Sequence, residues 1–207
     1  MGSETSQTRM TSIAPNRQKP AGATSRSQPI QRIVLTGFMG SGKSTVGRSL
    51  AQSLGWRFVD LDSVIEEHDG RTVARIFAES GEPAFRAMET DALTSSLQQS
   101  RVVLALGGGA LETPANRDVL GTAQQICVVL LTADFDTLYE RCRHQIPATS
   151  NASLPVRPLL GDREAAAARL ARREPIYRKA AHLILDTTGH QPEESVAALL
   201  EMLCNIL

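Results

Sequence analysis

The sequence lacks several features that define whole classes of proteins. Its 207 residues contain 22 lysines and arginines against 22 aspartates and glutamates, so there is no excess charge that would predict a nucleic-acid partner. No apolar run approaches the roughly 20 residues that a membrane-spanning helix needs. The only cysteines are Cys127, Cys142 and Cys204, and their wide spacing excludes a C-x-x-C motif. We expect free thiols in a reducing compartment, and no zinc site.

The composition is otherwise that of a globular protein, with 42% hydrophobic and 21% charged residues. Residues 1–29 differ, because they are rich in Ser, Thr, Gln and Pro and contain few large aliphatic side chains. Such a segment buries too little apolar surface to offset the entropy of ordering, so we expect a disordered tail followed by one domain at 30–207. Its arginine and serine content also resembles a plastid transit peptide. Since it lacks an amphipathic apolar face, we prefer a plain tail and a cytoplasmic protein.

Short apolar runs alternate with helical patterns along the rest of the chain. Runs typical of buried strands occur at 33–35, 58–62, 102–106, 126–131 and 183–185. The segments between them have helical spacing, and Gly55 and Gly70 are expected helix ends. A helix that begins at Asp162 is expected to be interrupted or kinked near Pro175. This alternation predicts an α/β protein with three layers, in which helices cover both faces of a five-stranded parallel sheet.

A phosphate-binding motif lies between the first expected strand and the first expected helix. The stretch Gly37-Phe38-Met39-Gly40-Ser41-Gly42-Lys43-Ser44-Thr45 fits the pattern G-x-x-x-x-G-K-[ST]. Its glycines allow a tight turn in which backbone N–H groups surround phosphate oxygens, and the helix N-terminus adds partial positive charge. Lys43 is expected to reach the outer phosphates, and the Ser44 hydroxyl to bind Mg²⁺ directly. The nucleotide-binding residues expected here are Gly40, Ser41, Gly42, Lys43, Ser44 and Thr45.

Polar residues and glycines follow two further strands, at the sheet edge where open parallel sheets bind ligands. Asp60 and Asp62 end the second strand on opposite sides, which predicts different roles. Asp60 is suited to hold a water bound to Mg²⁺, and Asp62 to accept a hydrogen bond from a substrate hydroxyl. The alternative is that acidic residues here only cap the next helix. Gly107-Gly108-Gly109 ends the third strand at a cost in backbone entropy, which favours a ligand packed against bare backbone over a simple turn.

Two further arginines are candidates for charge in the site. Arg86 and Glu89 are three residues apart and share one helix face. They form either an exposed ion pair that contributes little to stability, or a buried ion pair that holds the guanidinium ready for a substrate carboxylate. Residues 144–161, with several prolines, are typical of a long loop that closes as a lid. Arg157 in this lid delivers charge on closure, or is simply an exposed loop arginine.

The order of these segments is more specific than any one of them. The phosphate loop is followed by Asp60-Leu61-Asp62, Gly81-Glu82 with Phe85-Arg86 and Glu89, the glycine triplet with Ala110, Val156-Arg157-Pro158-Leu159-Leu160, and Arg173-Glu174-Pro175-Ile176-Tyr177. From about Ile30 to the C-terminus, the chain resembles the shikimate kinase family. The resemblance implies a P-loop fold like that of nucleoside monophosphate kinases, with a lid. It also implies phosphorylation of the 3-hydroxyl of shikimate, on the route to chorismate and aromatic amino acids, with ATP as donor and Mg²⁺ as cofactor.

The resemblance also implies a role for each matching position. The catalytic residues are Lys43, Asp62 and Arg157. The shikimate-binding residues are Asp62, Phe77, Phe85, Arg86, Glu89, Gly107, Gly108, Gly109 and Arg173, where Arg86 and Arg173 clamp the carboxylate and Glu89 orients Arg86. Arg141 and Gln191 lie where the family meets adenine, and Arg157 where it meets the transferred phosphate. The metal ligands are Ser44 directly and Asp60 through water.

Other functions remain open on sequence grounds. A related small-molecule kinase, such as a gluconate kinase, would share the phosphate loop but would not need the glycine triplet with both arginines. A nucleotide-dependent switch or regulatory NTPase is the alternative from another class. The lack of an N-K-x-D guanine signature argues against a GTPase, and no later strand carries a typical hydrophobic run with the acidic residue of a Walker B motif. We expect a monomer whose partners are shikimate and ATP, without nucleic acid or membrane.

Overall fold

The computed structural model describes residues 28–144, 162–204 and 206–207. The expected tail at 1–29 therefore lies outside the described residues, apart from its last two positions. The expected lid at 144–161 lies outside them apart from His144, and so does Arg157.

Strands and helices alternate along the described chain, as the sequence predicts. The strands are β1 (Arg32–Thr36), β2 (Arg57–Asp60), β3 (Val102–Ala105), β4 (Ile126–Thr132) and β5 (Leu183–Asp186). The α-helices are α1 (Lys43–Leu54), α2 (Leu61–Asp69), α3 (Val73–Ser96), α4 (Pro114–Thr122), α5 (Phe135–His144), α6 (Arg163–Ala180) and α7 (Pro192–Leu203). A single 3₁₀ turn, η1 (Ala110–Glu112), connects β3 to α4.

The strands form one parallel sheet in the order β2-β3-β1-β4-β5. This confirms the five-stranded parallel α/β sheet that the sequence predicts. The strand β1 lies at the centre, with β3 on one side and β4 on the other. The chain order therefore reverses at β1, and ligands of open parallel sheets bind at the carboxyl end of such a reversal point.

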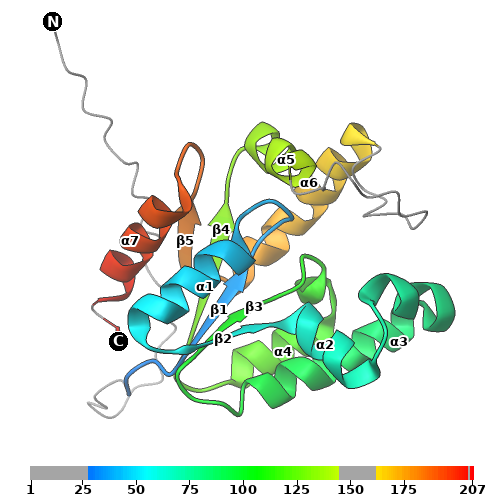
Figure 1. Ribbon diagram of the computed structural model, residues 1–207, viewed down its shortest axis with the longest axis horizontal. Helices are drawn as coiled ribbons and strands as arrows, with labels where there is room; N and C mark the ends of the chain where they lie inside the picture. Colours follow the sequence, from blue (N-terminus) through cyan, green and yellow to red (C-terminus); the bar gives the residue numbers. More distant parts are fainter. Residues whose placement is uncertain (1–27, 145–161, 205) are drawn as a thin grey trace, which may run out of the picture.

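Alternate residues of the central strands face two separate hydrophobic clusters, which gives the molecule three layers. Ile33 and Leu35 pack with α1 and α7, whereas Val34 faces the cluster formed with α2, α3, α4 and α6. Figure 1 shows α1 crossing one face of the sheet beside α7, while α4 covers the opposite face. Both faces of β1, β3 and β4 are therefore buried, and only the ends of these strands are open to a ligand.

Helix ends follow the expected glycine and proline chemistry, with two exceptions. Gly55 and Gly70 end α1 and α2 with φ of 64° and 78°, as predicted. The second strand stops at Asp60 instead of Asp62, because Asp60 is the N-cap of α2 and the chain is helical from Leu61. Helix α6 continues through Pro175 to Ala180, so an interruption there is wrong, while a kink at Pro175 stays a prediction.

Two expectations drawn from composition concern the membrane and the cysteines. Within 28–144, 162–204 and 206–207, no helix is both long enough and apolar enough to cross a bilayer. Cys127 and Cys142 are buried, Cys204 is exposed, and none of the three forms a disulfide bond within the described part of the chain. Burial raises the pKa of the Cys127 thiol to about 12, which keeps it uncharged in the core.

Candidate active site

The phosphate loop lies at the carboxyl end of β1 and leads into α1. Gly37, Gly40 and Gly42 have φ of 142°, 75° and 90°, conformations that favour glycine. A Cβ atom on Gly37 would lie 2.2 Å from the Leu131 carbonyl oxygen, and one on Gly40 would lie 2.2 Å from that of Leu138. The loop is therefore pressed against β4 and α5. Gly42, as the N-cap of α1, contributes no side-chain hydrogen bond, so the first N–H groups of the helix remain available for an anion.

The polar side chains of the loop contact its own backbone and the end of β2. Lys43 Nζ donates to the carbonyl oxygens of Gly37 and Phe38, both at 2.9 Å, so its ammonium group lies inside the loop. Ser44 Oγ donates to Asp60 Oδ2 at 2.7 Å. The structure thus brings together Lys43, Ser44 and Asp60 from the ends of β1 and β2.

The Ser44 and Asp60 oxygens form a plausible donor set for Mg²⁺. Magnesium prefers hard oxygen ligands and usually keeps several waters, while phosphate oxygens fill further positions. Among the described residues, no group of three or more His, Cys, Asp or Glu side chains could hold a metal by itself. One hydroxyl and one carboxylate beside a phosphate loop therefore fit a metal shared with the nucleotide, and not a metal held by the protein alone.

Asp60 and Asp62 do face different partners. The cause is not alternation along a strand, because β2 ends at Asp60 and Asp62 is already helical. Asp60 Oδ1 accepts a hydrogen bond from the Asp62 N–H at 3.2 Å and caps α2, while its other oxygen bonds Ser44. Asp62 lies in the first turn of α2, and its Oδ1 is 2.8 Å from the point where a Cβ on Gly107 would lie. Asp60 thus both caps a helix and faces the loop, and Asp62 reaches the glycine triplet.

The glycine triplet is the meeting point of the site. A Cβ on Gly107 would also lie 3.3 Å from Glu89 Oε1. A Cβ on Gly109 would lie 2.7 Å from Arg86 Nη2 and 3.1 Å from Arg173 Nη2. These distances are shorter than ordinary contacts, so a Cβ at Gly107 or Gly109 would displace the ends of these charged side chains. A Cβ on Gly108 would lie 3.8 Å from the Gly37 carbonyl oxygen, which places the triplet directly beside the phosphate loop.

Arg86 and Glu89 form the buried pair, and the exposed alternative is wrong. Both lie on α3; the Arg86 side chain is 19% exposed and that of Glu89 is fully buried. Arg86 Nη1 donates to Glu89 Oε2 at 2.9 Å, and its Nε and Nη2 donate to Glu82. Burial raises the pKa of the Glu89 carboxyl, and Arg86 opposes this increase. Glu89 Oε1 has no hydrogen-bond partner among the described residues and lies toward the triplet.

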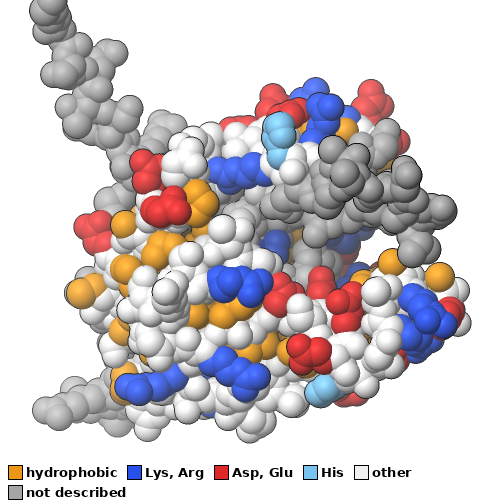
Figure 2. Space-filling model, viewed as in Figure 1, with side chains coloured by type: hydrophobic (Ala, Val, Ile, Leu, Met, Phe, Trp, Pro, Cys, Tyr) orange, Lys and Arg blue, Asp and Glu red, His pale blue; other side chains and the backbone are white. Residues whose placement is uncertain are grey.

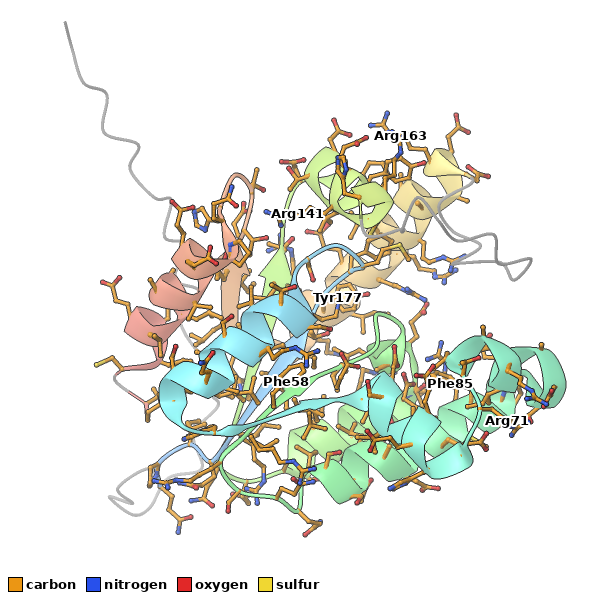
Figure 3. The ribbon with its side chains drawn as sticks, in the orientation of Figure 1. Phe58, Arg71, Phe85, Arg141, Arg163 and Tyr177 are labelled. Carbon is orange, nitrogen blue, oxygen red and sulfur yellow. The ribbon has the colours of Figure 1, made fainter. Side chains whose placement is uncertain are left out.

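Helix α6 supplies the second arginine. Arg173 is only 8% exposed. Its Nε donates to Glu112 Oε2 at 2.7 Å, and its Nη2 forms an ion pair with the same oxygen at 2.5 Å. One turn further along α6, the Tyr177 hydroxyl donates to the Gly108 carbonyl oxygen, and Figure 3 shows its ring near the centre of the molecule. Burial raises the Tyr177 pKa to about 12, so this hydroxyl keeps its proton at neutral pH.

Three residues in this network were missed from the sequence: Glu112, Asn116 and Tyr177. Tyr177 is four residues after Arg173, which is the spacing of one helix face, so this spacing was a usable signal. Asn116 is fully buried and donates to Glu89 Oε2 at 3.3 Å and to the Ala110 carbonyl oxygen at 2.9 Å. No spacing rule pointed to Glu112 or Asn116, because their partners are far away along the chain.

The expected adenine-facing residues also lie close to one another. Arg141 of α5 donates to Thr187 Oγ1 at 2.9 Å, and to the carbonyl oxygens of Thr187 and His190 at 2.8 and 3.1 Å (Figure 3). Gln191 follows as the N-cap of α7, and its N–H donates to Glu194 at 2.7 Å. Arg141 is therefore bound to the loop that ends in Gln191.

The two expected apolar walls differ in exposure. The rings of Phe77 and Phe85 on α3 are 4.6 Å apart between centroids. Phe85 is 3% exposed and belongs to the core, whereas Phe77 is 37% exposed. The Arg86 guanidinium is 5.4 Å from the Phe85 ring, so Phe85 supports the arginine.

The molecule is hollowed where these groups meet. Figure 2 shows a depression between the part formed by α5 and α6 and the part formed by α2 and α3, with lysine and arginine atoms inside it. A central phosphate loop, a parallel sheet of order β2-β3-β1-β4-β5 and two arginines beside bare backbone define a P-loop kinase that acts on a small molecule.

Comparison with known proteins then identifies the family. A family model described as shikimate kinase matches residues 39–204. A shikimate kinase of Geobacter metallireducens is 45% identical over 173 residues, which cover 82% of this chain and 90% of that one. The chain belongs to the shikimate kinase family.

Solved structures agree with this assignment. A shikimate kinase of Acinetobacter baumannii in complex with shikimate is 33% identical with a TM-score of 0.70, over 86% of this chain and 96% of that one. A gluconokinase of Sinorhizobium meliloti is 20% identical with a TM-score of 0.56, covering 87% of this chain and 94% of that one, and shares the fold alone. The comparisons therefore favour the shikimate kinase prediction over the gluconate kinase alternative.

Proposed function

We propose that this chain transfers the γ-phosphoryl group of ATP to the 3-hydroxyl of shikimate, giving shikimate 3-phosphate and ADP. The observation that carries the proposal is the approach of Arg86 and Arg173 to Gly109, beside the loop that holds Lys43. Two guanidinium groups over bare backbone suit a planar carboxylate. A carboxylate bound there would hold its ring next to the phosphate loop.

The donor half of the reaction rests on the loop and the start of α1. The backbone N–H groups of Gly40–Thr45 surround the β- and γ-phosphates, and Lys43 neutralises their charge. Ser44, with Asp60 through a water, would hold Mg²⁺, which supplies charge stabilisation for the phosphates when it is bound. Arg141 and Gln191 then border the adenine, since both lie at the loop after β5.

The acceptor half rests on positioning. Arg86 and Arg173 bind the carboxylate, Glu89 orients Arg86, and the backbone of Gly107, Gly108 and Gly109 forms the floor. Phe85 and Phe77 border the ring. Because phosphoryl transfer proceeds through a loose transition state, alignment of the hydroxyl with the γ-phosphorus matters more than its basicity.

Asp62 is the residue that meets the reacting hydroxyl. Its carboxylate reaches the triplet from the first turn of α2, close to where the acceptor ring would lie. There it accepts a hydrogen bond from the hydroxyl and takes its proton late in the transfer. Arg157, outside the described residues, is proposed to neutralise the transferred phosphoryl group.

Several features of the whole protein belong to the same proposal. One catalytic domain at 30–207 carries the reaction, and the protein acts as a monomer in the cytoplasm. Its partners are ATP and shikimate, without nucleic acid or membrane. The bacterial sources of the similar kinases are compatible with the cytoplasm.

A coupled assay of ADP release tests the proposal. Purified protein is supplied with ATP and Mg²⁺, together with shikimate, gluconate or no acceptor. ADP release that depends on shikimate is expected, with a background rate for gluconate and for no acceptor. Equal rates in all three reactions would indicate a nucleotidase, and a response to gluconate alone would indicate the alternative kinase.

A further inference from the structure

Arg173 is held by a residue that is far from it along the chain. Arg173 Nε donates to Glu112 Oε2 at 2.7 Å, and Nη2 forms an ion pair with the same oxygen at 2.5 Å. The other oxygen of Glu112 accepts a hydrogen bond from Arg172 Nη2 at 2.8 Å. Glu112 therefore ties two neighbouring arginines of α6 to η1.

The position of Glu112 is itself linked to the glycine triplet. Its N–H donates to the Gly109 carbonyl oxygen at 2.9 Å, within the 3₁₀ turn that follows the triplet. Arg117 Nη1 donates to the carbonyl oxygens of Leu111 and Glu112 at 2.6 and 2.9 Å. Glu112 therefore contacts both the end of the glycine triplet, through its backbone, and α6, through Arg173. A substitution at Glu112 would change how Arg173 is held beside the triplet.

The contact with Glu112 does not use Nη1 of the Arg173 guanidinium. Glu112 occupies the Nε and Nη2 side of Arg173. The Nη1 and Nη2 atoms lie 3.8 and 3.1 Å from the points where Cβ atoms on Gly108 and Gly109 would lie. A carboxylate that binds over the triplet can thus use the Nη1 and Nη2 side while Glu112 keeps the other.

Charge explains why Arg173 needs such a partner. Arg173 is 8% exposed and lies on α6 near two further arginines, Arg169 and Arg172. Burial lowers the pKa of Arg169, and the positive charges of Arg173 and Arg172 lower it further. Partial burial alone would raise the Glu112 pKa, but hydrogen bonds and charge from Arg173 and Arg172 outweigh it and lower that pKa. Glu112 is therefore ionised at neutral pH.

We propose that Glu112 is a positioning residue, which orients Arg173 for the carboxylate of the acceptor as Glu89 orients Arg86. The inference rests on the proposed function, since it assigns the acceptor carboxylate to Arg173. Each arginine of the site then has its own carboxylate, Glu89 from α3 and Glu112 from η1. Glu112 acts through Arg173 and does not touch the reacting atoms.

Substitution of Glu112→Gln tests this role, with a matched control at Glu174 on α6, the helix that carries Arg173. The control is Glu174→Gln, because Glu174 Oε1 likewise accepts from Nε and Nη2 of one arginine, Arg178, but on the surface. The Michaelis constant for shikimate is expected to rise about tenfold in E112Q, from weakened hydrogen bonds to a charged group. The same constant for ATP, and kcat, are expected to stay within about twofold, as for a loss of uniform binding. E174Q is expected to match the wild type.

A double-mutant cycle separates positioning from a structural effect. In an Arg173→Ala background, E112Q is expected to have no further effect on shikimate affinity, because the residue through which it acts is gone. Thermal unfolding of each variant identifies loss of fold. An equal effect of E112Q with and without Arg173, or an equal rise of both Michaelis constants, would overturn the inference. A wild-type protein that binds no shikimate would overturn the proposed function as well, whereas an inert E112Q in an active enzyme overturns only this inference.

Discussion

The chemistry of single residues in this site is dominated by arginines held by carboxylates. Arg86 uses Nε, Nη1 and Nη2 on Glu82 and Glu89, and this geometry requires a planar guanidinium. The arrangement aims both Arg86 and Arg173 at Gly109 before any ligand arrives. Binding then costs little additional side-chain entropy, because the donors are already in place.

A lysine in place of Arg86 tests the importance of the planar fork. Arg86→Lys keeps the charge but cannot bond Glu82 and Glu89 together while facing Gly109. We expect the Michaelis constant for shikimate to rise about tenfold or more, while that for ATP is unchanged. The control is Arg75→Lys on the part of α3 before its kink at Gly81, since Arg75 pairs with Glu79 at an exposed position. Steady-state kinetics with each substrate varied in turn measures both Michaelis constants. Equal Michaelis constants for shikimate in R86K and R75K would refute the role of the planar Arg86 guanidinium.

The buried carboxyl of Glu89 predicts a pH dependence of stability. Burial raises its pKa above the usual 4.5, so the folded protein keeps this proton to higher pH than the unfolded chain does. The contribution of protonated Glu89 to the free energy of unfolding is therefore complete below about pH 4.5. It is lost as the pH rises through the folded-state pKa of this carboxyl.

Comparison with Glu89→Gln isolates this effect. Because glutamine does not titrate, the free energy of unfolding of the wild type minus that of E89Q is expected to fall from pH 4.5 upward. Urea unfolding at a series of pH values measures the difference. A difference that rises with pH would mean that the folded state favours the ionised carboxyl.

At the scale of elements, the phosphate loop depends on the strand and helix beside it. The loop backbone is so close to β4 and α5 that a Cβ on Gly37 or Gly40 would overlap a carbonyl oxygen. Helix α5 also carries Arg141, which binds the loop after β5. The phosphate loop and the residues proposed to border adenine are therefore linked through one helix.

A pair of glycine substitutions separates backbone strain from this contact. Gly40 and Gly55 have similar φ, 75° and 64°, but a Cβ on Gly55 would have nothing within 4 Å. Both alanine variants bear the left-handed backbone cost of about 1 kcal/mol, whereas only Gly40→Ala also displaces α5 from the loop. We expect kcat/KM for ATP to fall about 100-fold in G40A and to be unchanged in G55A. Equal ATP kinetics would show that the close packing is irrelevant to nucleotide binding.

Most elements could be predicted from the sequence, because their signals are local. The strands are apolar runs, and Gly55, Gly70 and Pro192 mark helix boundaries by their own backbone preferences. Two predictions were wrong: the end of the second strand and the interruption of α6 near Pro175. The first failed because one residue has two roles, and the second because proline does not always interrupt a helix. Asp60 ends a strand and caps α2, and α6 accommodates Pro175 without a break.

At the scale of the whole molecule, the parallel sheet assembles the site. The ends of β1, β2 and β3 bring the phosphate loop, the two aspartates and the glycine triplet to one edge. The motifs named from the sequence converge there, since parallel strands end on the same side. The burial of Glu89 and the contact of Glu112 with Arg173 could not be predicted, because each depends on side chains packed from distant parts of the chain.

The most direct test of the account compares shikimate with its methyl ester as acceptor. The ester keeps the ring and hydroxyls but removes the charge that Arg86 and Arg173 are proposed to bind. The wild type is expected to prefer shikimate about 100-fold in kcat/KM, and Arg86→Ala to lose most of this preference. Equal use of shikimate and its ester by the wild type would contradict the carboxylate clamp.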